Sequence, residues 1–227
     1  MNEQLPFGTN DFAMNPEPRC PCILLLDTSG SMAGQPIAEL NNGLVTYKDE
    51  LAADLLASKR VEVAIITFGG EVETVCDFTT AESFQPPTLK AGGDTPMGAA
   101  IFEALQVLRR RKDEYKSNGI AYFRPWLFLI TDGGPTDGNV WLSASEEIKQ
   151  GEAQRAFSFF AVGVEEANLD VLKRLAVREP LKLKGLRFRD LFQWLSRSQQ
   201  SVSCSSPGDN VPLQNPASPE GWASTTA

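Results

Sequence analysis

The chain has 227 residues, of which 42% are hydrophobic and 22% charged, as expected of one soluble globular domain with short appendages. Its 21 basic and 29 acidic side chains give a formal net charge of −8, which disfavours nucleic acid and anionic membranes as partners and favours cations. Histidine is absent, which excludes Ser-His-Asp and Cys-His catalysis and His-ligated zinc, so a bound metal would be held by oxygen ligands or, as the less favoured alternative, by sulfur.

The N-terminal segment, residues 1–18, is polar and rich in Pro and Asn, and we interpret it as an extension without a secretory signal. No apolar run approaches the roughly 20 residues needed to cross a bilayer. Cys20 and Cys22 lie two residues apart on a predicted strand, so their side chains point to the same face and are poorly placed for a mutual disulfide. Cys-x-Cys also lacks the ligand spacing of a zinc site. We therefore expect idle thiols and a cytoplasmic protein.

Four near-continuous apolar runs predict strands that are buried on both faces, as in a parallel sheet. A further run, Val72–Phe78, follows a tight turn and alternates with polar residues, which predicts an antiparallel edge strand. The four buried strands are expected at Cys22–Leu26, Val61–Phe68, Trp126–Ile130 and Phe157–Val164.

Apolar residues at spacings of three and four predict helices between these strands. The basic run Arg109–Lys112 is expected near the C-terminus of the second helix, where the helix dipole stabilises cations. Strands that alternate with helices imply a doubly wound α/β fold, in which a mostly parallel sheet with one antiparallel edge strand carries helices on both faces. The helices are expected at Ile37–Leu55, after Pro96, and at Ser143–Arg155, Leu169–Val177 and Asp190–Ser198.

The last part of the chain, residues 199–227, is rich in Ser, Pro, Asn and Gly, and this composition predicts a disordered tail. Trp222 stands isolated among small polar residues of this tail. A docking peptide is one explanation for it, but the composition favours a residue without a defined role. The folded domain is therefore expected to span residues 19–198.

Three loops are expected at the carboxyl ends of the strands or at a helix start, the edge of an open α/β sheet at which ligands bind. The first, Asp27–Ser31, places a carboxylate and two hydroxyls at alternate positions around a turn at Gly30, and such oxygens suit a hard cation. The second, Gly92–Gly98, contains paired glycines and the hydroxyl of Thr95. The third, Thr131–Asp137, repeats the pattern of an apolar strand, a terminal Asp and a glycine turn.

Each of these loops alone has a structural explanation. Asp27–Ser31 could cap the helix that follows it, and Gly92–Gly98 could be a turn and a helix start. Thr131–Asp137 has the composition of a turn. The three loops together, in this order and beside these strands, form a much more specific pattern.

Five positions of this pattern resemble the metal-ion-dependent adhesion site (MIDAS) of von Willebrand factor A (VWA) domains. The similarity covers about residues 19–198, and no motif position is substituted. The positions are Asp27-x-Ser29-x-Ser31, then Thr95, then Asp132.

The segments Cys22–Ile37 and Thr131–Asp137 resemble more particularly the bacterial TerY-like branch of the family. That branch is associated with tellurite-resistance and chemical-stress gene clusters. The resemblance thus implies a role in a bacterial stress-response complex.

The resemblance also implies a ligand set, in which Ser29, Ser31 and Thr95 supply hydroxyls and Asp27 and Asp132 hold the ion directly or through water. Mg²⁺ is expected, with Mn²⁺ and Ca²⁺ as alternatives. Mostly neutral ligands leave the charge of the cation undercompensated, so an Asp or Glu carboxylate of a protein partner would complete the coordination. Metal-dependent protein binding is the function that this implies.

Two further carboxylates, Asp94 and Asp137, lie close to the motif in the sequence without belonging to it. They could accept hydrogen bonds around the site, or they could cap turns.

An alternative function is that of a Mg²⁺-dependent phosphotransferase or phosphatase with Asp27 as the nucleophile. Enzymes of the haloacid dehalogenase type place a second Asp two residues later as acid and base, and Ser29 occupies this position here. No phosphate-binding Gly-x-x-x-x-Gly-Lys-[Ser/Thr] loop is present. A scaffold domain with an incidental site is a further alternative, against which the complete motif argues. We therefore expect a binding domain and not an enzyme.

Overall fold

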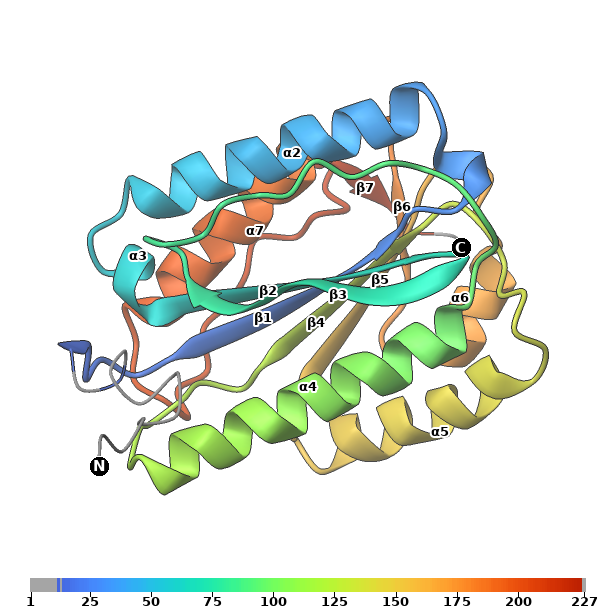
Figure 1. Cartoon of the computed structure of the whole chain (residues 1–227). Helices are drawn as coiled ribbons and strands as arrows, with labels where there is room; N and C mark the ends of the chain where they lie inside the picture. Colours follow the sequence, from blue (N-terminus) through green and yellow to red (C-terminus); the bar gives the residue numbers. More distant parts are fainter. Residues whose placement is uncertain (1–11, 13, 226–227) are drawn as a thin grey trace, which may run out of the picture.

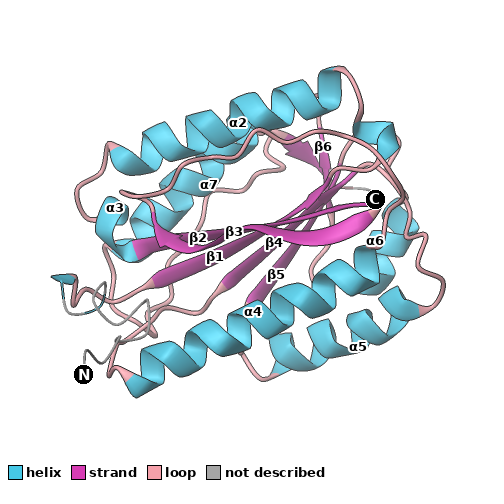
Figure 2. Ribbon diagram, in the orientation of Figure 1, coloured by secondary structure: helices cyan, strands magenta, loops and turns pink. Residues whose placement is uncertain are grey.

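The fold is built on one seven-stranded sheet with helices on both faces (Figures 1 and 2). A computed structural model describes residue 12 and residues 14–225 of the chain. The strand order is β3-β2-β1-β4-β5-β6-β7. The strands are β1 (Cys20–Asp27), β2 (Val61–Gly69), β3 (Glu71–Thr80), β4 (Trp126–Thr131), β5 (Ser158–Gly163), β6 (Leu181–Leu183) and β7 (Ala223–Ser224).

The centre of the sheet is parallel, and both of its edges are antiparallel. Strands β2, β1, β4, β5 and β6 pair in parallel, and β3 runs antiparallel to β2. All eight residues of β1 are buried, which explains its unbroken apolar run. The predicted α/β architecture with an antiparallel edge strand is confirmed. A second antiparallel pair, β6 with β7, closes the other edge, and its strands of three and two residues are too short to produce a sequence signal.

Two helical layers cover the sheet, with α2, α3 and α7 on one face and α4, α5 and α6 on the other (Figure 1). Successive residues of β1 divide between the two cores, because Leu24 faces the first layer and Leu25 the second. Within the described residues, no helix combines the length and the apolarity of a membrane span. The helices are α2 (Gln35–Ala52), α3 (Ala57–Arg60), α4 (Met97–Ser117), α5 (Val140–Ala153), α6 (Leu169–Leu175) and α7 (Phe188–Ser203).

The cysteines agree with the sequence prediction. Cys20 and Cys22 both belong to the core beneath α2 and α7, so their side chains share one face of β1. Both are free thiols, as are Cys76 and Cys204. Burial raises the pKa of the Cys22 thiol to about 12, which keeps it protonated and unreactive at neutral pH.

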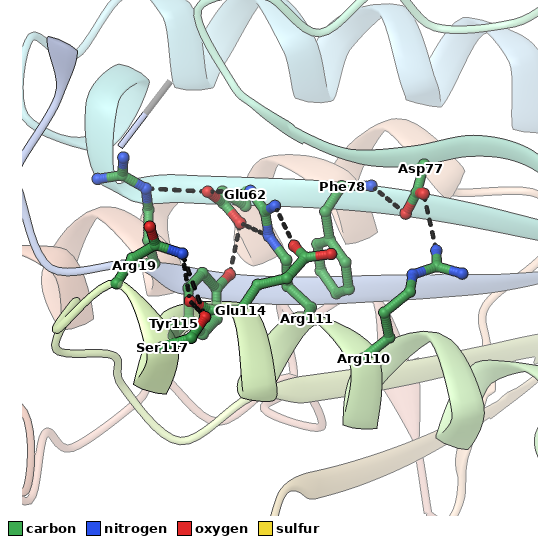
Figure 3. Close-up of polar contacts among 10 residues, drawn as sticks. Arg19, Glu62, Asp77, Phe78, Arg110, Arg111, Glu114, Tyr115 and Ser117 are labelled. Carbon is green, nitrogen blue, oxygen red and sulfur yellow. Dashed lines mark hydrogen bonds and ion pairs between the residues drawn. The ribbon is translucent and has the colours of Figure 1, made fainter. Parts of the chain in front are cut away.

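Helix α4 is longer than the sequence predicted, and this changes the role of its basic run. The helix ends at Ser117, so Arg109–Lys112 lies well before its C-terminus, and the helix dipole does not explain these residues. Instead its three arginines form ion pairs with β2, β3 and α5, two of which are visible in Figure 3: Arg109 with Glu147, Arg110 with Asp77 and Arg111 with Glu62.

Helix α2 is shorter than the sequence predicted. It ends at Ala52, and Leu55, which the apolar spacing places on the buried face of this helix, is 86% exposed. The reason is local, since the Asp54 carboxylate accepts hydrogen bonds from the backbone N–H groups of Leu56 and Ala57 and starts a new turn.

The structure differs from the expectation of a disordered tail after residue 198. Helix α7 continues to Ser203, and Gln199 is fully buried, where its side-chain carbonyl accepts a hydrogen bond from the Tyr47 hydroxyl. Further on, Trp222 is 3% exposed and its ring packs edge-on against Trp194 at 5.7 Å. Composition failed here because a few buried residues, spaced among small polar ones, are enough to anchor an irregular segment.

The N-terminal extension is described only in part, because residues 1–11 and 13 lie outside the described residues. Its last residues contact the domain, since Arg19 donates hydrogen bonds to the backbone carbonyls of Asn15 and Glu17. The Phe12 ring lies 4.8 Å from the Arg111 guanidinium.

Candidate metal centre

The three loops singled out by the sequence meet at the carboxyl end of the sheet. Strands β1 and β4 are neighbours there, and the chain leaves them in opposite directions, so the loops after them form the switch point at which α/β folds bind ligands. The backbone joins the first loop to the second. Gly30 donates its N–H to the carbonyl of Gly93 at 2.9 Å, and Gly92 donates to that of Thr28 at 2.8 Å.

Asp27, the last residue of β1, is fully buried, and both of its carboxylate oxygens accept hydrogen bonds. Oδ1 accepts from the backbone N–H of Ser29 at 2.8 Å. Oδ2 accepts from the hydroxyl of Thr131 at the end of β4. Asp27 therefore links the two central strands and fixes the start of the first loop.

The two serine hydroxyls connect this loop to the third one. Ser29 Oγ lies 3.0 Å from Ser31 Oγ, and the Ser31 hydroxyl donates to Asp132 Oδ1 at 2.9 Å. Ser29 is 2% exposed, whereas Ser31 faces solvent. The oxygens thus form a short line that runs from the buried floor of the site to its surface.

The fifth predicted residue, Thr95, is 5% exposed and faces the same place. A Cβ atom on Gly133 would lie 3.6 Å from Thr95 Oγ1 and 4.0 Å from Asp27 Oδ2, so both oxygens lie close to this glycine of the third loop. The structure therefore brings together Asp27, Ser29, Ser31, Thr95 and Asp132.

Glycines allow the loops to approach so closely. Gly93 has a φ of +77°, and a Cβ atom there would lie 2.6 Å from the Cα of Gly70 in the β2–β3 turn. A Cβ atom on Gly69 would lie 2.3 Å from the carbonyl oxygen of Thr28. No larger side chain fits at either position without moving the backbone.

Sequence reasoning missed two threonines of the site. Thr131 orients Asp27, and Thr136 accepts a hydrogen bond from the Thr95 N–H at 2.9 Å. In the sequence, only their position on the same loop as Asp132 could have indicated that these threonines belong to the site. Of the two extra carboxylates, Asp137 caps α4 by accepting from the N–H of Ala99, and Asp94 is exposed.

The site is negative and its donors are oxygens. Burial raises the pKa of the Asp27 carboxyl above its usual value, the hydrogen bonds from Ser29 and Thr131 oppose this, and the negative charge of Asp132 adds to it. Among the described residues, neither carboxylate forms an ion pair, and no three acidic or thiol side chains gather as metal ligands. A cation bound here would therefore depend on hydroxyls as well as on these two carboxylates, a donor set that fits a hard divalent ion.

A family model for the von Willebrand factor type A domain matches residues 22–181. The chain belongs to this family. The VWA domain is 25% identical to inter-alpha-trypsin inhibitor heavy chain H2 of Sus scrofa in an alignment 182 residues long, which covers 72% of this chain and 18% of that protein. The chain thus spans less than a fifth of the relative.

Several solved structures share the fold at low sequence identity. A von Willebrand factor type A protein from Catenulispora acidiphila has a TM-score of 0.64 and 14% identity, over 81% of this chain and 43% of that one. Proximal thread matrix protein 1 of the mussel byssus, with a zinc-occupied MIDAS motif, has a TM-score of 0.53 and 16% identity, over 83% and 48%. Manganese-loaded TRAP of Plasmodium vivax has a TM-score of 0.50 and 20% identity, over 77% and 62%.

Proposed function

We propose that this VWA domain holds a divalent cation with Asp27, Ser29, Ser31, Thr95 and Asp132, and that it binds an acidic side chain of a protein partner through that cation. One observation carries the proposal: the hydroxyls of Ser29 and Ser31 and the carboxylate of Asp132 lie in hydrogen-bonding contact although they come from two distant loops. With Asp27 and Thr95 beside them, they form a MIDAS-like set of oxygens.

The donor chemistry supports a small hard ion, and Mg²⁺ is our first choice, followed by Mn²⁺ and Ca²⁺. Zinc in the mussel byssus protein and manganese in the Plasmodium protein support a divalent ion in general. Ser29 and Asp27 would form the buried floor of the site. Ser31, which is exposed, would form its open side toward the partner.

The partner chemistry follows from the charges of the ligands. Three of the five proposed ligands are neutral hydroxyls, and where Asp27 or Asp132 holds the ion through water, the charge of the cation is only partly compensated, so that an incoming carboxylate is attracted. Asp27 is held in one orientation by its hydrogen bonds from Ser29 and Thr131, at the buried end of the site. An Asp or Glu side chain of a partner, rather than a basic or apolar one, is therefore the group we expect to bind.

The enzyme alternative finds no support in the position of Asp27. A phosphotransfer nucleophile needs an accessible oxygen in line with the phosphorus. Asp27 is fully buried, and each of its oxygens already accepts a hydrogen bond. We therefore favour binding over catalysis.

The cellular role rests on resemblance alone. The segments Cys22–Ile37 and Thr131–Asp137 support the TerY-like branch, and with it a cytoplasmic complex of the bacterial tellurite or chemical stress response. Loss of tellurite tolerance in a deletion strain, restored by the wild-type chain but not by Ser31→Ala, is the phenotype we expect. Full tolerance in the deletion strain would contradict this role.

Partner capture tests the function itself. We expect the immobilised chain to retain a protein from a lysate of its host in Mg²⁺, and to lose it in EDTA or on Ser31→Ala. Thr46→Val is a matched control, because within the described part of the chain the Thr46 hydroxyl bonds to the Asn42 carbonyl of its own helix, α2, and to no other group. A protein retained equally in EDTA and by the Ser31→Ala variant would contradict metal-dependent capture.

A further inference from the structure

Thr136 holds the backbone of Thr95 at two points. Its hydroxyl accepts the N–H of Thr95 at 2.9 Å, and its own N–H donates to the carbonyl of Thr95 at 2.9 Å. Thr136 is exposed, and its hydroxyl bonds to the Thr95 backbone, whereas the hydroxyls of Ser29 and Ser31 bond to each other and to Asp132, so we do not count Thr136 among the ligands. It lies on the same loop as Asp132, which is one.

The neighbouring Asp137 secures the chain on the other side of Thr95. Its Oδ2 accepts the N–H of Ala99 in the first turn of α4, and this turn begins directly after Thr95 and Pro96. Its Oδ1 is buried and has no hydrogen-bond partner within the described residues. The third loop therefore forms hydrogen bonds both to Thr95 and to the first turn of the helix that follows it.

The segment before Thr95 is held by other loops, through backbone hydrogen bonds at Gly92, Gly93 and Asp94. None of these bonds reaches Thr95 itself. Its N–H donates to the Thr136 hydroxyl, and its carbonyl accepts from the N–H groups of Thr136 and of Met97 in the following helix. Among the described residues, the two bonds from Thr136 are thus the backbone hydrogen bonds that tie Thr95 to another loop.

We infer that Thr136 is a positioning residue. Its two hydrogen bonds to the Thr95 backbone, made from the loop that carries Asp132, set the position of the Thr95 hydroxyl in the cation site. This inference rests on the proposed cation site. Because the third loop carries Asp132 and is bonded to Thr95, the carboxylate of Asp132 and the hydroxyl of Thr95 approach or leave the ion together. The ligands of the first and third loops need the Thr95 hydroxyl of the second loop to complete the site.

The test compares Mn²⁺ binding by calorimetry with the number of water molecules on bound Mn²⁺, measured by water-proton relaxation. We expect Thr136→Val to weaken Mn²⁺ binding about 10-fold, the effect typical of substituting a residue that hydrogen-bonds to a metal ligand. We also expect it to add about one water to the bound ion, because a withdrawn hydroxyl leaves a coordination place for water. Thr136→Ser keeps the acceptor and should behave as wild type.

A double variant separates positioning from a general loss of order. Thr95→Val alone should reproduce the extra water, and Thr95→Val with Thr136→Val should bind no more weakly than Thr95→Val, because both changes remove the same ligand. Melting temperatures in EDTA verify that each variant is folded. Losses that multiply, or a Thr136→Val variant with wild-type affinity and hydration, would overturn the inference. Absence of Mn²⁺ binding by the wild-type chain would overturn the proposed function and this inference with it.

Discussion

Arg19 and Glu62 form an ion pair of 2.9 Å in which both side chains are 1% exposed (Figure 3). They lie where β1 and β2 begin, at the opposite end of the sheet from the candidate metal centre. Glu62 also accepts two hydrogen bonds from Arg111 and one from the Tyr115 hydroxyl. A single buried carboxylate thus satisfies donors from the residue that precedes β1 and from α4.

Glu62→Gln should destabilise the fold strongly. The amide removes the negative charge that compensates Arg19 and Arg111, and breaking a buried ion pair on one side costs about 3–5 kcal/mol. Arg110→Ala is the matched control on the same helix, because the Arg110–Asp77 pair is 55% and 62% exposed and such pairs contribute less than about 1 kcal/mol. Urea denaturation measures both variants. Equal losses would show that burial does not set the strength of these pairs.

Gly93→Ala should disturb the site as well as the fold. The new Cβ atom would meet Gly70 at 2.6 Å, and the φ of +77° disfavours any side chain. Gly119→Ala is the control, since Gly119 has a φ of +66° after the end of α4, with no atom of the described residues within 4 Å of a Cβ. We expect about 1 kcal/mol for Gly119→Ala from the backbone alone, and about 1–3 kcal/mol more for Gly93→Ala. Similar melting temperatures for the two variants would show that the loops are not tightly packed.

Trp222→Ala tests whether the C-terminal segment is anchored. Loss of a buried Trp costs about 3–5 kcal/mol, whereas Trp222→Phe should cost little, because its indole N–H is buried without a partner in the described residues. Glu220→Ala, at an exposed position nearby, is the control. Thermal melting that is unchanged by Trp222→Ala would restore the expectation of a disordered tail.

Asp27→Asn should separate stability from cation binding. Burial raises the pKa of the Asp27 carboxyl, so its ionised form is disfavoured in the fold, and a neutral amide should be at least as stable in EDTA. With Mn²⁺ at about 100 times its dissociation constant, wild type should gain about 2.7 kcal/mol and the variant nothing. An equal gain in the variant would mean that the ion binds elsewhere.

The sequence predicts those features well whose residues all lie within one strand or one loop. The apolar run Cys22–Leu26 predicted a central strand, and the spacing of Ser29 and Ser31 predicted two hydroxyls side by side, as the structure has them. Contacts between distant segments left no such trace. Glu62 lies within an apolar run, and nothing near it in the sequence indicates the arginines that pair with it.

The same limit applies to the support of the site. Thr136 acts on Thr95 across 41 residues, and no local pattern in either segment indicates this contact. The small polar neighbours of Trp222 predict a disordered tail, but the ring that packs against it, Trp194, lies far away in the sequence, on α7. The structure at these positions is set by tertiary contacts, which local sequence patterns do not show.

Calorimetric titration of the wild-type chain and of Ser31→Ala with Mn²⁺ tests the central claim most directly. Ser31 is exposed and its hydroxyl links Ser29 to Asp132, so its removal should leave the fold intact, as Thr46→Val should. The account predicts one saturable site in the wild type and in Thr46→Val, and none in folded Ser31→Ala. Equal binding by wild type and Ser31→Ala, or no binding by wild type, would contradict it.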